Sequence, residues 1–461
     1  MIVNFAERAH NHNWRLDPIT RSLLDTDFYK LLMLQFIWKH FPAVEVTFTL
    51  VNRSSTVSLA DRIGIDELRM QMDSVRSLRF HKSELIWLAG NTFYGKRGIF
   101  EPDFLEWLER DFQLPDYELS IVDGDLSLSF HGLWTQTTLW EVYALSILSE
   151  LKTRASLRGM SEFSLDIMYA RAKAKLWNKI ESLRGVPGLK IADFGTRRRH
   201  SFLWQEYVVK AMRDTLGASF TGSSNTYLAY KHDLEAIGTN AHELPMALAA
   251  MAESDEELKA SQYRMLELWQ NTYQRELLIM LPDTFGTTQF LDGAPEWVTD
   301  WTGQRMDSKD PYIAGDEYID WLRKRGRDPE KKLIIASDGL DVEDILGLHA
   351  YFAGEIRGDY TPQDFRSAED FLDARKWNPK RRIRFSSGWG TLLTNDFRNC
   401  HPGGDNGFDP ISLVCKLTDA NGRPAVKLSD NYAKAMGTPE DVARYRRVFG
   451  TAGVANVPML V

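Results

Sequence analysis

Seven short apolar runs, all after residue 189, lead directly into polar residues of the kinds that bind substrates or catalyse reactions. Parallel strands that are buried on both faces read as short, continuous apolar runs. In a β/α barrel the catalytic residues gather at the carboxyl ends of these strands, on one face. The pattern therefore predicts an α/β enzyme whose active site is assembled from strand ends. The runs lie at residues 190–192, 218–220, 237–238, 277–281, 301–303, 333–336 and 383–385.

The composition is that of an ordinary globular protein, and it excludes several classes. A chain of 461 residues can hold two domains, or one large barrel with an appendage. The net charge of −8 argues against a general nucleic-acid binder, although a local basic patch can still bind a small anionic substrate. No apolar stretch is long enough for a membrane span, and residues 1–14 lack the apolar core of a signal peptide. With only two cysteines, Cys400 and Cys415, we expect neither a zinc cluster nor a disulfide framework, and we expect a cytoplasmic protein.

The first part of the chain is predicted to be a separate domain of mixed α+β structure, residues 1–136. A helix is expected within residues 15–42, where apolar residues recur at helical spacing, and an alternating strand is expected at 44–51. Two further alternating runs flank Asp123-Gly124, which predicts a β-hairpin with a tight turn.

The β/α barrel domain is expected at residues 137–395. It begins with a long helical stretch, 137–184, rich in alanine, leucine, lysine and glutamate, and the strand–helix alternation follows. The tail, 396–461, contains a predicted strand at 412–417 and is expected to return to the N-terminal domain.

Three consecutive arginines follow the first of the apolar runs. Arg197, Arg198 and Arg199 come shortly after the strand expected at 190–192, and a helix is expected to follow them. Guanidinium groups bind phosphate or carboxylate through paired hydrogen bonds, and a helix N-terminus adds backbone N–H donors. The segment therefore indicates an anion site, with a solvated basic turn as the alternative. Which arginine contacts which anion stays open at this point.

Two turns rich in glycine and serine, at 222–225 and 386–390, lie at strand ends on the same predicted face. Glycine lets the backbone approach an anion closely, so that backbone N–H groups can surround it. Such turns are common, and one alone indicates little. Two on one face point to two anionic groups, or to one extended phosphorylated ligand.

His242 and several aspartates are the candidate catalytic residues at the other strand ends. A histidine is available in its neutral form at pH 7 because its free pKa is about 6.5, so His242 could act as a base, a metal ligand or a nucleophile. Asp283, Asp307, Asp338 and Asp341 could together hold Mg²⁺, which prefers oxygen ligands. For each aspartate the alternative is a helix N-cap at a strand-to-helix turn.

An ordered set of motifs, spread from about residue 20 to residue 440, resembles the nicotinate phosphoribosyltransferase family in its longer bacterial branch. No single motif is sufficient, but the set in this order is highly specific. The motifs are Asp-Thr-Asp-Phe-Tyr-Lys at 25–30, Asp-Phe-Gly-Thr-Arg-Arg at 193–198, Gly-Thr-Asn-Ala-His-Glu at 238–243, Ser-Asp-Gly-Leu-Asp at 337–341, Phe-Ser-Ser-Gly-Trp-Gly-Thr at 385–391 and Lys-Leu-Ser-Asp-Asn at 427–431.

The resemblance implies a reaction, a fold and partners. The family joins nicotinate to 5-phosphoribosyl pyrophosphate, giving nicotinate mononucleotide and pyrophosphate in NAD salvage, and couples this reaction to ATP hydrolysis. Mg²⁺ and ATP are therefore the expected cofactors. The implied fold is an irregular β/α barrel of the type II phosphoribosyltransferases, packed against the mixed α+β N-terminal domain. The implied assembly is a homodimer with a shared active site.

The same resemblance implies roles for individual residues. Phe194 matches the aromatic residue that stacks on the pyridine ring, and Tyr29 matches the tyrosine that covers the other face from the neighbouring subunit. His242 matches the histidine that ATP phosphorylates. Arg197 and Arg305 match basic residues around the base and the pyrophosphate. Asp283, Asp307 and Asp338 match acidic residues near the ribose and Mg²⁺. Ser387, Gly388 and Gly390 match the loop that holds the 5′-phosphate. Of these, Asp283 and Asp338 are also the possible metal ligands.

The base pocket is expected to prefer nicotinate to nicotinamide. Relatives that use nicotinamide resemble this chain but carry an acidic residue near the position of Asn225. Here Ser224 and Asn225 are uncharged and can donate hydrogen bonds to a carboxylate, and arginines lie nearby in the sequence. Nicotinamide and quinolinate phosphoribosyl transfer are the alternatives within the class. Outside it, the alternatives are a Mg²⁺-dependent barrel hydrolase or aldolase that uses Asp283 and Asp338, and a non-catalytic, phosphate-binding regulatory barrel.

Overall fold

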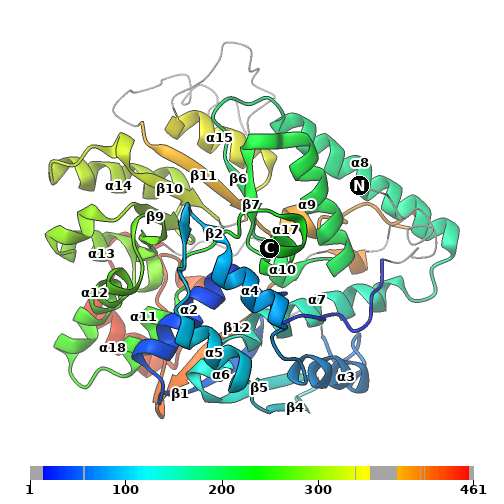
Figure 1. The fold of residues 1–461 in the computed structure, drawn as a ribbon, viewed down its shortest axis with the longest axis horizontal. Helices are drawn as coiled ribbons and strands as arrows, with labels where there is room; N and C mark the ends of the chain where they lie inside the picture. Colours follow the sequence, from blue (N-terminus) through cyan, green and yellow to red (C-terminus); the bar gives the residue numbers. More distant parts are fainter. Residues whose placement is uncertain are drawn as a thin grey trace.

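Two large β-sheets organise the part of the chain that the computed structural model describes, residues 14–54, 58–337, 339–353, 382–404, 406–409 and 411–455. One is a six-stranded parallel sheet, and the other is a five-stranded antiparallel sheet with strands from both ends of the chain. Figure 1 shows the parallel sheet in the upper half of the molecule and the antiparallel sheet below it. The α/β class and the separate N-terminal unit predicted from the sequence are confirmed.

The parallel sheet has the strand order β7-β6-β11-β10-β9-β8. Its strands are β6 (Ile191–Asp193), β7 (Phe220–Ser223), β8 (Ile279–Met280), β9 (Gly303–Met306), β10 (Leu333–Ala336) and β11 (Arg384–Trp389). Six of the seven apolar runs therefore overlap with strands. The seventh run, 237–238, stays irregular, and the residue before it makes a single parallel bridge, Ser223↔Ala236, beside β7.

The irregular segment 235–240 spans the space between β7 and β8, the two ends of the parallel sheet. On the β7 side, the N–H of Ser223 donates to the carbonyl oxygen of Glu235 (3.2 Å), and the N–H of Ile237 donates to the carbonyl oxygen of Ser223 (2.9 Å). On the β8 side, the Asn240 side chain donates to the carbonyl oxygen of Ile279 (2.9 Å). An irregular barrel would close at this segment, and the closure itself stays a prediction.

Helices surround the parallel sheet (Figure 1). They are α8 (Glu162–Leu183), α9 (Phe202–Leu216), α10 (Thr226–His232), α11 (Glu243–Ala250), α12 (Asp255–Thr272), α13 (Thr287–Gly293), α14 (Pro311–Lys324), α15 (Val342–Ala353), α17 (Thr391–Thr394) and α18 (Pro439–Phe449). Ser201, Ser254 and Asp310 each accept a hydrogen bond from a first-turn N–H of α9, α12 and α14. These caps satisfy donors that a helix N-terminus leaves unpaired. Among the described helices, none combines the length and apolar character needed to cross a membrane.

The antiparallel sheet has the strand order β13-β12-β1-β5-β4, so that the tail supplies two of its strands. Its strands are β1 (Glu45–Asn52), β4 (Tyr117–Val122), β5 (Asp125–Leu133), β12 (Leu413–Ala420) and β13 (Arg423–Pro424). The β4–β5 and β12–β13 hairpins turn at Asp123-Gly124 and Asn421-Gly422, where all four residues have positive φ, as type I′ turns require. The tail thus pairs with the N-terminal sheet through β12 and β1, while the domain boundaries at 136 and 395 stay predictions.

The helical stretch expected at 137–184 is two helices rather than one. Helix α7 (Trp140–Leu157) ends shortly before Gly159, whose φ of 79° belongs to the left-handed region and breaks the helix. Helix α8 then begins with its own cap, because Oγ of Ser161 accepts from the N–H of Ser164 (3.2 Å).

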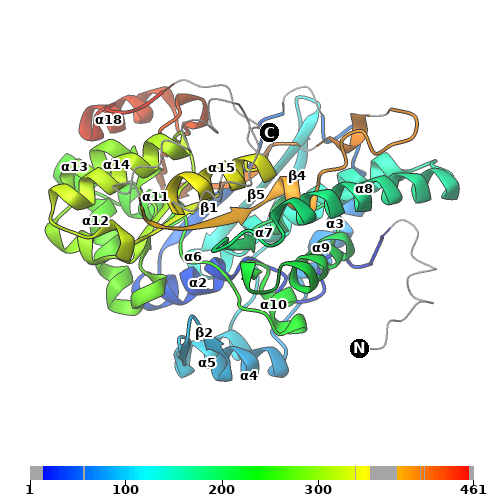
Figure 2. The same ribbon diagram turned by 90° about the horizontal axis from the view of Figure 1, so that it is seen from above.

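Helix α2 (Phe28–His40) is buried on every side over residues 28–37. A helix that is mostly apolar around its whole circumference belongs in a protein interior, and α2 lies in contact with both units. It is shorter than the helix expected within 15–42. The smaller elements of the N-terminal unit are α3 (Ile65–Arg76), α4 (Lys82–Gly90), α5 (Pro102–Arg110), α6 (Trp134–Thr137) and the hairpin of β2 (Thr92–Phe93) and β3 (Lys96–Arg97). Figure 2 shows α4, α5 and this hairpin as a layer of their own beside α2.

Gly303→Ala should lower the thermal unfolding midpoint of the protein. A Cβ at residue 303 would lie 2.0 Å from the carbonyl oxygen of Leu333 on the neighbouring strand. Because that oxygen is a backbone atom, β9 and β10 would have to separate, and we expect a loss of about 2 kcal/mol or more. The matched control is Gly90→Ala, since a Cβ at the end of α4 meets no atom within 4 Å. Equal unfolding midpoints for the two variants would contradict this packing.

Candidate active site

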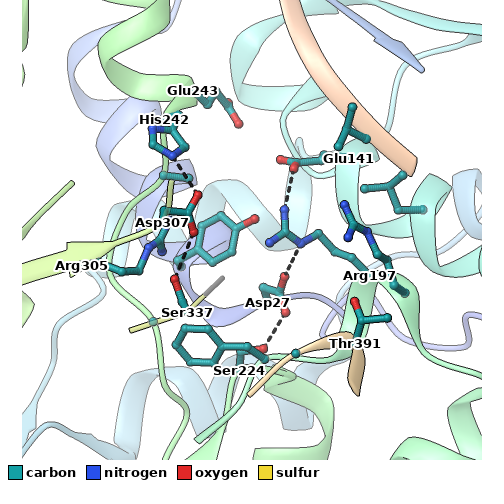
Figure 3. A pocket seen from close by; sticks show the side chains of 18 of the residues that line it. Asp27, Glu141, Arg197, Ser224, His242, Glu243, Arg305, Asp307, Ser337 and Thr391 are labelled. Carbon is teal, nitrogen blue, oxygen red and sulfur yellow. Dashed lines mark hydrogen bonds and ion pairs between the residues drawn. The ribbon is translucent and has the colours of Figure 1, made fainter. Parts of the chain in front are cut away.

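A cavity of about 270 Å³ lies at the carboxyl ends of the parallel strands, between the two units. Figure 3 shows side chains of both units pointing into it. The site residues predicted from the sequence that line it are Tyr29, Phe194, Arg197, Ser224, His242, Arg305, Asp307 and Gly390. Five other predicted residues are described but do not line it: Asn225, Asp283, Asp341, Ser387 and Gly388. Asp338 lies outside the described residues.

Tyr29 reaches the cavity in the same chain that supplies Phe194. The segment before α2 pairs with the end of β7: the N–H of Phe28 donates to the carbonyl oxygen of Ser224 (2.7 Å), and the N–H of Thr226 donates to the carbonyl oxygen of Thr26 (2.8 Å). This pairing holds the first turn of α2 beside its own parallel sheet. Tyr29 therefore lines the cavity of its own chain, while the homodimer and the sharing of its active site stay predictions.

Phe194 rests directly on the backbone of β11. A Cβ at Gly388 would lie 2.4 Å from the Phe194 ring, and the N–H of Phe194 donates to the carbonyl oxygen of Trp389 (2.8 Å). Glycine at position 388 is therefore explained by the close approach of the ring. Ser387 is fully buried in the same strand. The residues of this loop that do face the cavity are Gly390 and Thr391, where α17 begins.

His242 lies one residue before α11, and both of its ring nitrogens have partners. Nε2 lies 3.1 Å from Oδ2 of Asp307 and 3.6 Å from Oδ1 of Asp283, while Nδ1 lies 2.9 Å from Oγ1 of Thr284. Burial lowers the pKa of His242, although the Asp283 and Asp307 carboxylates oppose this shift. The ring is therefore neutral at pH 7, and the two carboxylates favour the tautomer with the proton on Nε2. The lone pair is then on Nδ1, where it accepts a hydrogen bond from the Thr284 hydroxyl.

Asp307 and Asp283 approach His242 from one side. Burial raises the pKa of the Asp307 carboxyl, but the hydrogen bond from His242 and the charge of Arg305 outweigh it and hold the pKa well below its usual range. Asp283 is buried and accepts a hydrogen bond from Oγ of Ser308 (2.6 Å). Both aspartates therefore have fixed positions beside the imidazole.

The same three side chains form a candidate cation site. His242, Asp283 and Asp307 each offer a ligand atom, and these atoms lie within 4.8 Å of one another. Oδ1 of Asp283 is buried and has no hydrogen-bond partner among the described residues. An oxygen in this state suits a hard cation such as Mg²⁺.

The three consecutive arginines differ in their surroundings. Arg199 is fully buried and donates two hydrogen bonds of 2.7 Å to the carboxylate of Asp25. Arg198 lines the cavity but donates to a backbone carbonyl at the start of β12. Arg199 therefore has a structural role, and Arg197 and Arg198 are the two of the three that line the cavity.

Arg197 and Arg305 are the predicted anion-binding arginines that line the cavity (Figure 3). The Arg197 side chain is 43 % exposed and lies between Glu141 (3.1 Å) and Asp27 (3.5 Å). Arg305 donates from Nη1 to the carbonyl oxygen of Asn240 (3.2 Å), and its buried Nε has no hydrogen-bond partner among the described residues. Since an unpaired buried donor is costly, Arg305 is suited to an anionic ligand.

Ser224 and Asn225 have different surroundings although they are adjacent in the chain. Ser224 lines the cavity, and its hydroxyl donates to Oδ1 of Asp27 (2.7 Å). Asn225 is fully buried: its Nδ2 donates to Asp25 (2.7 Å), and its Oδ1 accepts from the N–H of Leu228 (3.0 Å) at the start of α10. The structure thus places Asn225 in a helix cap, and Ser224 is the uncharged side chain of this pair that faces the cavity.

Four basic residues of the N-terminal sheet and the tail also line the cavity, and sequence reasoning missed them. We call them the basic wall: Arg53 after β1, Lys416 in β12, and Lys427 and Lys434 in the tail. Burial and the charges of Lys427 and Arg53 lower the pKa of Lys416 well below its usual range. The pairing of β12 with β1 brings Arg53 and Lys416 to the same cavity, although they lie far apart in the sequence. The motif at 427–431 was the one local signal for any of the four residues.

The fold and the cavity are typical of an α/β enzyme whose site lies at strand ends and presents basic side chains. Comparison with known families narrows this class. The nicotinate phosphoribosyltransferase (NAPRTase) family matches residues 189–360 and 364–452, and the N-terminal domain of that family matches residues 24–149. The chain belongs to the nicotinate phosphoribosyltransferase family.

Solved structures of this family are similar over both units. The nicotinate phosphoribosyltransferase from Vibrio cholerae shares 30% sequence identity with a TM-score of 0.78, and the match covers 95% of this chain and 96% of that chain. The nicotinate phosphoribosyltransferase from Porphyromonas gingivalis shares 26% identity with a TM-score of 0.76, over 94% of this chain and 100% of that chain. The resemblance found in the ordered motifs therefore extends to the three-dimensional fold.

Mixing Tyr29→Ala chains with His242→Asn chains tests the shared active site. A shared site should recover activity, because one of the two sites of a mixed dimer would then be fully wild type. A cavity completed within one chain, which both residues line here, would keep one defect in each site. Formation of nicotinate mononucleotide after co-expression measures this, with wild-type chains co-expressed with each variant as the control. Recovery of a substantial part of the wild-type rate would mean that Tyr29 acts in the cavity of a partner subunit.

Proposed function

We propose that the protein transfers the 5-phosphoribosyl group from 5-phosphoribosyl pyrophosphate to nicotinate, and that ATP stimulates this reaction by phosphorylating His242. The products of the transfer are nicotinate mononucleotide and pyrophosphate. His242 carries this proposal: Nε2 is held by Asp307 at 3.1 Å, and Nδ1 lies 2.9 Å from the Thr284 hydroxyl. A neutral imidazole held in this way, next to a cavity with basic side chains, is suited to attack a phosphoryl group.

The base subsite is proposed between Phe194 and Tyr29. Two aromatic faces would bind the pyridine ring with roughly 0.5–1.5 kcal/mol per pair beyond burial, and Arg197 or Arg305 would pair with the carboxylate. In the transfer, the pyridine nitrogen forms a bond to C1 of the ribose as the C–O bond to pyrophosphate breaks. Positive charge develops at the anomeric carbon, and the two rings keep water away from it.

The basic wall is the proposed site for the leaving pyrophosphate. Burial and the nearby charges of Lys427 and Arg53 lower the pKa of Lys416 well below its usual range. A bound anion would relieve this repulsion, and it would also stabilise negative charge on the departing oxygen. Wild-type binding of pyrophosphate should therefore weaken with rising salt concentration.

The ATP step is proposed to use Nδ1 of His242. Nδ1 attacks the γ-phosphorus, a P–N bond forms, and the P–O bond to ADP breaks. Asp307 holds the proton on Nε2 and stabilises the positive charge that the ring gains during the attack. Later attack by water on the phosphohistidine releases phosphate and returns the neutral ring.

Mg²⁺ is proposed to bind at Asp283 and Asp307, where it supplies neutralisation of phosphate charge. The unpartnered Oδ1 of Asp283 supports this placement. We also propose a cytoplasmic location, since the two cysteines, Cys400 and Cys415, are free and buried. A homodimer is proposed from the family resemblance.

The purified protein should form nicotinate mononucleotide faster with ATP than without it, and the γ-phosphate of ATP should label the protein. His242→Asn should abolish both the label and the stimulation, because an amide nitrogen is not a nucleophile. The control is His131→Asn, which removes a half-exposed histidine of β5. A wild-type level of label on His242→Asn would contradict the phosphohistidine. Product formation from nicotinamide or from quinolinate, with none from nicotinate, would favour the corresponding alternative.

The kcat/KM for nicotinate should exceed that for nicotinamide by about tenfold or more. An amide would leave Arg197 or Arg305 poorly paired, and an unpaired buried polar group costs about 1–3 kcal/mol. Ser224→Asp should narrow the preference, because a second carboxylate beside Asp27 would repel nicotinate. Steady-state rates with each base decide this, and comparable kcat/KM values for the wild type would refute the preference.

A further inference from the structure

Tyr94 occupies the tip of the β2–β3 hairpin in an unusual backbone conformation. Tyr94 and Gly95, the two tip residues, both have positive φ, 51° and 74°. Asparagine, aspartate or glycine normally occupies the first of these positions in a two-residue hairpin turn, because a bulky side chain is strained there. Strain of this kind persists only where surrounding contacts hold the residue, and it clusters at functional sites.

Three hydrogen bonds hold the hairpin tip against the segment that leads to His242. The N–H of Tyr94 donates to Oε1 of Glu235 (2.8 Å). The Tyr94 hydroxyl accepts from the N–H of Gly238 (2.7 Å) and donates to the carbonyl oxygen of Gly238 (3.0 Å). One side chain thus satisfies both backbone groups of a residue 144 positions later in the chain. Tyr94 also lines the cavity.

Gly238 in turn packs against the backbone of Tyr29. A Cβ at residue 238 would lie 2.6 Å from the backbone nitrogen of Tyr29 and 3.1 Å from its Cβ. The hairpin has a second attachment next to this contact, because the rings of Phe93 and Phe28 stack with centroids 4.8 Å apart. The hairpin therefore holds Phe28, the residue before Tyr29, through Phe93. It holds Gly238, which packs against Tyr29, through Tyr94.

We propose that Tyr94 is a positioning residue for Tyr29: by holding Gly238, it fixes the tyrosine ring that forms one wall of the base subsite. Because Tyr29 has this role only under the proposed function, the positioning role rests on that function. Tyr94 needs no contact with the base itself. Loss of its hydroxyl would loosen Gly238 and then Tyr29, while the basic wall and the loop at Gly390 keep their own contacts.

The central experiment compares Tyr94→Phe with Tyr263→Phe. Tyr263 also donates its hydroxyl to a backbone carbonyl, that of Phe290 (2.7 Å), but between α12 and α13 and outside the cavity wall. With the other substrate saturating, Tyr94→Phe should raise the KM for nicotinate about tenfold and leave the KM for 5-phosphoribosyl pyrophosphate within about twofold of the wild type. Tyr263→Phe should change neither KM, and both variants should unfold at similar temperatures.

Tyr94→Asn separates positioning from stability. Asparagine is preferred at this turn position, so the variant should keep its unfolding midpoint and still raise the KM for nicotinate about tenfold. Gly238→Ala should raise the same KM, because its Cβ would displace Tyr29. The double variant Tyr94→Phe/Gly238→Ala should be no worse than the worse single variant, since both changes act through one contact.

An unchanged KM for nicotinate in Tyr94→Phe and Tyr94→Asn would overturn the positioning role, and so would equal increases in both KM values. A wild-type enzyme that uses another pyridine base would overturn the proposed function instead. In that case, the role of Tyr94 is decided by comparing the KM of Tyr94→Phe with that of the wild type for the base that the wild type does use.

Discussion

One buried lysine forms ion pairs that connect helices of the two units. Lys30 of α2 is fully buried, and it pairs with Glu141 of α7 (2.6 Å) and with Glu243 of α11. Burial alone lowers the pKa of Lys30, but the two carboxylates outweigh it and hold the pKa above its usual value. Removing one partner of such a pair leaves an uncompensated charge at a cost of about 3–5 kcal/mol. The three helices are therefore held together, and the residue that follows His242 is fixed by the same ion pair.

The same set of charges extends into the cavity and shows how an acidic protein can present basic side chains to an anion. Glu141 also pairs with Arg197, which lies 3.5 Å from Asp27. The arginine is thereby held at the cavity with part of its side chain exposed. The net charge of −8 belongs to the whole chain, whereas the basic wall and the strand-end arginines set the local potential where phosphates would bind.

The sequence predicted those features that depend on neighbouring residues in the chain. Continuous apolar runs became β10 and β11, and Asp123-Gly124 makes the tight turn between β4 and β5. The run at 237–238 did not become a strand, because Gly238 is packed against Tyr29 and hydrogen-bonded to Tyr94. Both partners lie far away in the sequence. The basic wall was missed for the same reason. The β2–β3 hairpin was missed because strands of two residues are too short to show a periodic pattern.

The pairing of β12 with β1 has a consequence for the synthesis of the chain. Glu45 donates its N–H to the side chain of Asn421, which lies 376 residues later. At about 5–20 residues per second, a ribosome needs on the order of tens of seconds to make the residues between them. Until then β1 lacks one of its two neighbouring strands, and such an open edge can pair with another nascent chain. On a polysome, the β1 edge that the enzyme's own tail must cover therefore stays open while the neighbouring nascent chains expose the same edge.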